Sequence, residues 1–202
     1  MSAWQTESDE VVSFGPMLPK KGTKLEIVSA ESATWTVKAE SAGGAPGHEG
    51  EAYPAMKLTL TITDTNIQTE GEHIRLRTTL DHQMNLAKYP FLSKKTGEVQ
   101  WMGRTGLYGL ETSLGFDPVY VNGSGAPVEP FIAKDGRKLA PKGEDIKRQL
   151  NPAFMSAFFT AEGNPNLEWA GKTVYGNVEI ERSEKYWDKN IITQFVAAPM
   201  SL

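Results

Sequence analysis

The most regular feature of the chain is an alternation of apolar and polar residues in its first half. MKLTLTITDT (56–65) places its apolar residues on one face and lysine and threonine on the other. HIRLRTTLD (73–81) repeats this pattern, with Arg75 and Arg77 on the polar face. The intervening residues 66–72 are typical of a turn. We therefore expect two neighbouring antiparallel strands whose polar faces lie side by side.

Five other segments carry patterns of apolar spacing and capping residues that predict further elements. They are a strand at 23–37, a helix at 103–116 with Thr105 as N-cap and Gly115 as stop, a hairpin at 128–141 turning at Asp135-Gly136, a helix at 151–163 with Asn151 as N-cap and Phe154 and Phe158 as core, and a terminal strand pair at 171–198.

The elements add up to about five strands, three before a helix-bearing insertion and two after it. This order predicts a mainly β fold, a five-stranded OB-fold-like antiparallel barrel. The chain then forms one domain over 1–202, with a loose N-terminus at 1–15 and a long insertion at 82–170. Other small barrels and sandwiches share the same strand pattern and remain alternatives.

The composition excludes several classes of protein. The 202 residues are 39% hydrophobic, enough for a core, and include no cysteine, which excludes disulfides and thiolate metal sites. The start lacks a secretory signal and no stretch reaches the roughly 20 apolar residues of a membrane span. We expect a cytoplasmic protein, in the host cytoplasm if it is viral, without a membrane partner. The net charge of −4 still allows a local basic groove.

Signatures of catalysis are missing from the sequence. AGKT (170–173) resembles the end of a phosphate-binding loop, but Asn166 stands where the first glycine is needed and a strand follows. His48, His73 and His82 match no metal-ligand spacing. We expect no enzyme, no cofactor and no metal.

The polar strand face is the first candidate site. Lys57 would share it with Arg75 and Arg77, with no carboxylate before Asp64. Guanidinium groups suit phosphate because their donors form a planar, always charged fork. The alternative is a solvated face whose arginines pair with Glu26 or another acid.

The loops supply the aromatic residues that this face lacks. In an OB-fold the ligand is flanked by the first and fourth strand connections, here a Gly-rich loop ending at Tyr53 and KYWDK (185–189). Lys185, Tyr186 and Trp187 combine cations with flat rings, as single-stranded nucleic acid requires. The alternative is that these two rings fold back and cap the barrel.

Two further groups complete the candidate set. Lys134, Arg137 and Lys138 surround the 128–141 turn and form either a basic arm or a plain solvated turn. Trp35 is either a stacking platform or a core residue. For Trp101, packing against the barrel is the favoured interpretation.

In layout the chain resembles bacteriophage single-stranded-DNA-binding proteins of the OB-fold type. The segments that carry this are KKGTKLEIVSAESATW, MKLTLTITDT, EHIRLRTTL and WAGKTVYGNVEIE with KNIITQFV, about two-thirds of the chain. The resemblance implies sequence-tolerant coating of single-stranded DNA, or of RNA, in phage replication and recombination, with homodimers or cooperative self-association on the strand. The end, FVAAPMSL, departs from the acidic tail of many such proteins. A non-enzymatic virion or assembly protein on a β-barrel scaffold is the rival hypothesis.

If the strand-face arginines contact phosphates, the affinity for single-stranded DNA falls with salt at a log–log slope of about −0.7 per contact. Replacing Arg75 and Arg77 together by alanine should then weaken binding equally for all sequences, as measured by fluorescence titration. Unchanged affinity in this double variant would eliminate the strand-face site.

Overall fold

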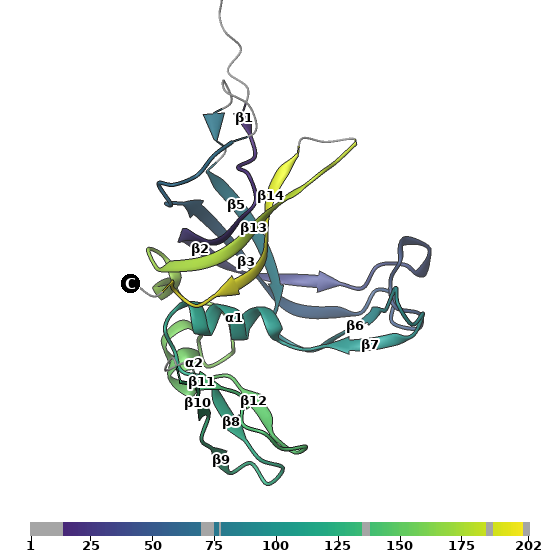
Figure 1. Cartoon of the computed structure of the whole chain (residues 1–202). Helices are drawn as coiled ribbons and strands as arrows, with labels where there is room; N and C mark the ends of the chain where they lie inside the picture. The colour runs from purple at the N-terminus through teal and green to yellow at the C-terminus, as the bar shows by residue number, and fades with distance from the viewer. Residues whose placement is uncertain (1–13, 70–74, 77, 135–137, 185–187, 200–202) are drawn as a thin grey trace, which may run out of the picture.

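A long antiparallel pair of strands, β2 (Lys20–Thr36) and β3 (Ala52–Ile62), forms the centre of the structure (Figure 1). The computed structural model describes residues 14–69, 75–76, 78–134, 138–184 and 188–199. In β3 the side chains of Met56, Leu58 and Leu60 are buried and Lys57 is exposed. The alternation thus separates a core face from a solvent face, as the sequence predicts.

Three more strands extend this pair into a five-stranded antiparallel sheet in the order β14-β13-β2-β3-β5. They are β5 (Thr79–Asn85), β13 (Thr173–Glu181) and β14 (Lys189–Val196). Three strands of the sheet precede the insertion and two follow it, so the mainly β class and the terminal strand pair are confirmed. The insertion between β5 and β13 runs from 86 to 172.

The third strand lies further along the chain than the alternation of 73–81 predicts. β5 begins at Thr79 and pairs with β3 through Leu80 opposite Leu60 and Met84 opposite Met56. Arg75 lies in β4 (Arg75–Leu76), which pairs in parallel with β1 (Phe14–Gly15) in a separate ladder. The predicted bounds of this strand are therefore wrong, because residues 75–76 pair with the N-terminal segment while burial of Leu80 and Met84 fixes the edge of the sheet.

Helix α1 (Thr105–Ser113) packs across the end of the sheet, where it contacts β5, β13 and β14. Leu107 and Leu110 are buried on its inner side. Two glycines allow the close approach: Gly106 faces Met84 of β5, and Gly109 faces the backbone of Phe195 in β14. The helix thus lies at both outer strands of the sheet.

The ends of α1 match the prediction only in part. Gly115 follows the helix with φ +85°, the left-handed conformation that ends helices, as predicted. The predicted N-cap Thr105 is wrong, because Thr105 is the first helical residue and Arg104 precedes it without a side-chain cap.

Helix α2 (Pro152–Phe158) and the 3₁₀ turn η2 (Leu167–Trp169) form an aromatic core layer. Asn151 caps α2 by accepting the amide of Ala153 at 2.8 Å, as predicted, but the helix ends at Phe158 rather than near Gly163. Buried Trp169 donates its indole N–H to the carbonyl of Phe158 at 2.7 Å. Phe154 and Phe158 are both core residues, as expected.

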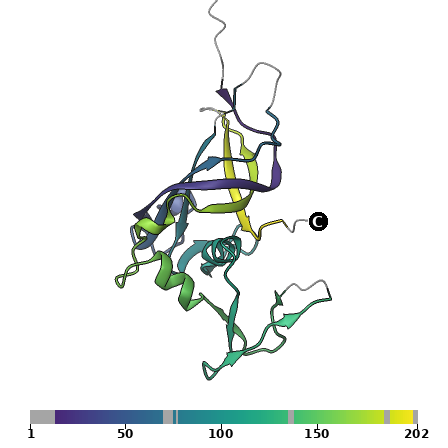
Figure 2. The same ribbon diagram turned by 90° about the vertical axis from the view of Figure 1, so that its left-hand side faces the viewer.

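The rest of the insertion consists of short strands. β8 (Val119–Val121), β9 (Pro127–Val128) and β12 (Lys147–Gln149) form a three-stranded sheet, and β10 (Phe131–Ile132) pairs with β11 (Lys138–Leu139) within the hairpin predicted for 128–141. We call this unit, residues 119–149, the arm. Figures 1 and 2 show the arm pointing away from the sheet, with α1 between the two.

A buried carboxylate fixes the arm to the helices. Glu111 of α1 has no solvent exposure and pairs with Arg148 of β12 at 2.8 Å. Its other oxygen accepts the backbone N–H of Asn151, where α2 begins. Arg148 also donates to the carbonyl of Tyr108 at 3.0 Å and lies over the Tyr108 ring, 4.7 Å from its centroid. One side chain therefore joins α1, the arm and α2.

The packing of α1 predicts opposite effects for two identical substitutions. A Cβ at Gly109 would lie 2.8 Å from the Phe195 carbonyl oxygen, whereas at Gly106 the nearest atom is 3.6 Å away. We expect Gly109→Ala to destabilise the protein by about 1–3 kcal/mol through overpacking. Gly106→Ala should be neutral or stabilise it by up to about 1 kcal/mol, because alanine favours helix. Urea unfolding measures both, and equal effects would contradict the observed packing.

His82 of β5 predicts a dependence of stability on pH. Its ring meets the Phe195 ring edge-on at 5.4 Å, and burial lowers the pKa of His82 below its ordinary value. As the pH falls through about 6.5, the unfolded chain takes up a proton that the folded protein resists, so stability falls. The urea midpoint should drop between pH 7.5 and pH 5.5, and His82→Gln should reduce that drop. The same drop in both proteins would contradict this origin.

Candidate functional site

Four aromatic rings gather at one end of the β2–β3 pair. Trp35 and Tyr53 are cross-strand partners, with ring centroids 6.2 Å apart. Tyr89 approaches Trp35 at 4.6 Å, and Trp101 approaches Tyr53 at 6.4 Å. We call these four residues the aromatic cluster. The predicted stacking platform Trp35 is thus half-buried among other rings rather than in the core.

The second pair of rings comes from the hairpin of β6 (Tyr89–Leu92) and β7 (Val99–Met102). Figure 1 shows this hairpin projecting on the same side as the β2–β3 loop. Tyr89 is held by its hydroxyl, which lies 2.8 Å from the Met102 sulfur. Trp101 packs on Tyr53 of the central strand pair, in line with the expected packing, but the residue remains 55% exposed. Its ring is open to a planar ligand.

The β2–β3 loop, with the 3₁₀ turn η1 (Glu40–Ala42), braces the cluster through a carboxylate. Glu51 accepts the Tyr53 hydroxyl at 2.5 Å and lies 2.9 Å from Nδ1 of His48. The hydrogen bond from Tyr53, and then the one from His48, lower the pKa of Glu51, and Glu51 in turn raises the pKa of Tyr53. His48 meets Trp101 edge-on at 5.6 Å. Tyr53 therefore stays a protonated donor at neutral pH, and its ring is held in place.

Basic residues surround the β6–β7 hairpin. Lys94 and Lys95 lie in its turn, which closes through the amide of Gly97 on the carbonyl of Ser93 at 2.8 Å. Lys88 and Arg104 flank its two strands. All four cations are exposed, and within the described ranges none forms an ion pair. Since Glu98 is the one acid among residues 88–104, the hairpin is distinctly positive.

The predicted cationic strand face is not present in the form expected. Lys57 is exposed, but it pairs with Asp81 of β5 at 3.3 Å and faces Glu31 across the ladder. The register of β5 brings Asp81 onto this face, opposite Thr59 and within reach of Lys57. Arg75 lies outside this sheet, in the β1–β4 ladder. With two acids against one lysine, the face carries no excess positive charge at Lys57.

The remaining predicted residues divide between the arm and segments that the structure does not describe. Lys138 pairs with Asp117 at 2.5 Å, and Lys134 is exposed. Arg77, Arg137, Lys185, Tyr186 and Trp187 lie outside the described residues. At the base of the last loop, Arg182 donates to Asp188 at 2.5 Å, and this bond, with the amide of Ser183, lowers the pKa of Asp188.

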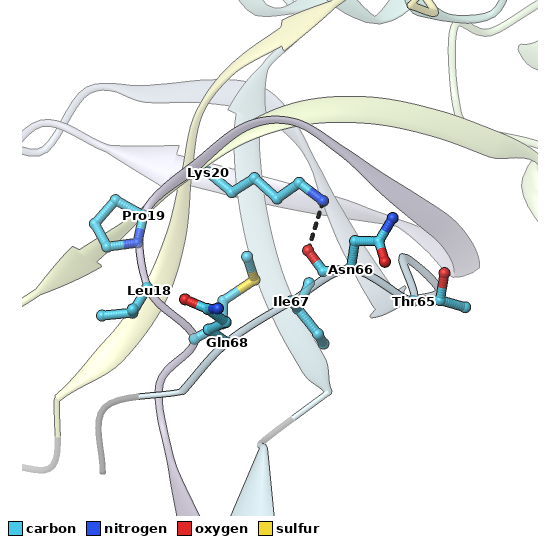
Figure 3. Close-up of a pocket in the computed structure, with 8 residues that line it drawn as sticks. Leu18, Pro19, Lys20, Thr65, Asn66, Ile67 and Gln68 are labelled. Carbon is cyan, nitrogen blue, oxygen red and sulfur yellow. Dashed lines mark hydrogen bonds between the residues drawn. The ribbon is translucent and has the colours of Figure 1, made fainter. Parts of the chain in front are cut away.

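A hollow of about 380 Å³ near the start of β2 offers a contrasting surface (Figure 3). Its cation, Lys20, donates to the carbonyl of Asn66 and pairs with Asp64, each at 2.8 Å. Burial acts to raise the pKa of Asp64, but the bonds from Lys20 and two backbone amides outweigh it and hold that pKa low. The charge of Lys20 is thus neutralised by its neighbours and is not available to an incoming anion.

Within the described residues no group of three or more His, Asp or Glu side chains is placed to hold a metal ion. Over the same ranges, every helix is too short or too polar to cross a membrane. Comparisons with family models, with curated proteins and with solved structures give no match.

The most accessible part of the site, the β6–β7 hairpin, is not among the site residues predicted from the sequence. KYPFLSKKTGEVQWMGR (88–104) carries a detectable signal: two short apolar runs around a Lys-Lys-Thr-Gly turn, with a cation beside each aromatic end. The sequence does indicate Trp35 as a stacking candidate and Tyr53 at the end of a binding loop. Their meeting with Tyr89 and Trp101 joins residues more than 30 positions apart.

Proposed function

We propose that this protein binds single-stranded DNA without catalysis and with little sequence preference. The observation that carries the proposal is the exposed ring of Trp101 in an aromatic cluster, beside a hairpin whose four cations have no ion-pair partner among the described residues. Bases stack on aromatic rings regardless of their identity, and cations follow the phosphates. The cluster supplies the stacking surface and the hairpin supplies the charge.

The proposed fold behind this function is an OB-type barrel in which β5 and β14 adjoin. Its support is the strand order, in which these are the two outer strands, and the contact of α1 with both. The ring contact between His82 and Phe195 joins the same two strands at 5.4 Å. In such a barrel the β2–β3 loop flanks the ligand. The aromatic cluster lies beside that loop.

The distribution of exposed charges suggests the path of single-stranded DNA over the surface. The β2–β3 loop carries exposed Glu40 and Glu49 and would repel phosphate. The β6–β7 hairpin carries Lys88, Lys94 and Lys95 and would attract it. We therefore place the phosphates along the hairpin and the bases against Trp101.

The cellular role implied by the resemblance, coating of single-stranded DNA in phage replication and recombination in the host cytoplasm, is part of this proposal. The second candidate is an assembly protein. It is favoured by the arm, where Phe131 and Ile132 are each 63% exposed, because exposed apolar groups suit protein contacts.

The proposal predicts that Trp101→Ala lowers the affinity for a short oligo-dT by about five- to a hundredfold, the loss of one stacked base. Fluorescence anisotropy of a labelled oligonucleotide that is long enough for one protein measures this affinity, with a duplex of equal length as comparison.

The double variant Lys94→Ala with Lys95→Ala tests the cations of the hairpin. The log–log slope of affinity against salt concentration should become shallower by about 0.7 for each phosphate that the hairpin no longer binds.

The matched control is Phe131→Ala, which removes a similarly exposed ring from the arm. It should retain the affinity of the unmodified protein for the short oligonucleotide. Loss of affinity in this control with normal binding by Trp101→Ala would move the site to the arm. Absence of binding to single strands by the unmodified protein would favour the assembly role.

A further inference from the structure

The β10–β11 hairpin of the arm carries an apolar hollow that the described part of the chain leaves open. Its volume is about 590 Å³, and Pro130, Phe131, Leu139 and Pro141 line it. Glu129 and Lys142 lie at the same hollow, and Lys134 is exposed on the same hairpin. Exposed apolar surface of this kind marks contact sites on soluble proteins.

The arm is held rigidly at its base. Arg148 joins it to α1 through Glu111 at 2.8 Å and through the Thr112 hydroxyl at 3.0 Å. The Tyr108 hydroxyl donates back to the carbonyl of Arg148 at 2.9 Å. These bonds anchor β12, while the separate β10–β11 hairpin that carries the hollow is attached by the ion pair between Lys138 and Asp117.

A second exposed apolar group lies on η2. Leu167 is 94% exposed, although its neighbour Trp169 is fully buried. The turn is fixed by the side chain of Asn166, which accepts the amide of Glu168 at 2.9 Å. Glu168, the next residue of the turn, is also exposed. We call Leu167 with Glu168 the η2 knob.

We propose that the hollow of one copy of this protein accepts the η2 knob of a second copy. Leu167 supplies an apolar group for the hollow, and Glu168 beside it complements Lys142, which lines the hollow together with Glu129. Figure 2 shows α2 and the β10–β11 hairpin on opposite sides of the molecule, so the contact joins different copies. Because two different patches meet, the interface is heterologous and continues from copy to copy as a ring or filament.

This inference does not require nucleic acid and goes beyond the proposed function. Its test is sedimentation velocity of the full chain, without DNA, over a range of concentrations. We expect self-association of the unmodified protein. Leu167→Ser and Phe131→Ser should each raise the dissociation constant by about tenfold or more. Val28→Ser, at an exposed apolar residue of β2 outside both patches, should not change it.

Mixing the two single variants distinguishes a head-to-tail contact from a symmetric one. The Leu167→Ser protein keeps its hollow and the Phe131→Ser protein keeps its knob, so an equimolar mixture should form a dimer that neither forms alone. Charge provides a second measure: Lys142→Glu should weaken association, and adding Glu168→Lys to the same chain should restore it. Near-ultraviolet circular dichroism checks that each variant is folded.

Several outcomes would overturn the inference. They are a monomeric unmodified protein at every concentration, normal association of Leu167→Ser, or a mixture that stays monomeric. An arm-to-arm contact would show weakened association in Phe131→Ser alone. None of these results bears on the binding of single-stranded DNA, which the short oligonucleotide measures separately.

Discussion

A carboxylate without access to water fixes the arrangement of the whole insertion. Glu111 must be paired, because an uncompensated buried charge is strongly destabilising. Its two oxygens bind Arg148 of the arm and the amide of Asn151 at the start of α2. The helix that carries it is in turn held against the backbone of β14 at Gly109. The arm, α2 and the sheet are therefore all positioned by their contacts with α1.

Helix α1 also connects the two surfaces proposed to bind ligands, the aromatic cluster and the arm. Its first residue, Thr105, follows β7 and the aromatic cluster, and the chain leaves its last turn towards β8 and the arm. The cluster and the arm thus lie at opposite ends of one rigid helix. The β6–β7 hairpin proposed for single-stranded DNA and the arm surface proposed for a second copy therefore do not overlap.

Cations that are paired with acids and cations that are not lie on different parts of the described surface. On the sheet face, Lys57 is neutralised by Asp81, and at the base of the last loop Arg182 binds Asp188. On the β6–β7 hairpin, within the described residues, Lys94 and Lys95 have no acidic partner. A protein of net charge −4 can thus still present a local cationic edge, because neutralisation is uneven over its surface.

Local patterns determined the elements whose signals lie within a few residues. The alternation of β3, the cap of α2 by Asn151 and the stop of α1 at Gly115 depend on neighbouring positions, and the sequence predicts each of them. Tertiary structure decided what depends on pairing between distant segments. Burial of Leu80 and Met84 fixed the register of β5 and brought Asp81 to Lys57, and two separate ladders brought Trp35 and Tyr53 to Tyr89 and Trp101. A strand pattern of period two specifies two faces but not its partner, so the cluster and the ion pair of Lys57 could be recognised only once the strands were paired.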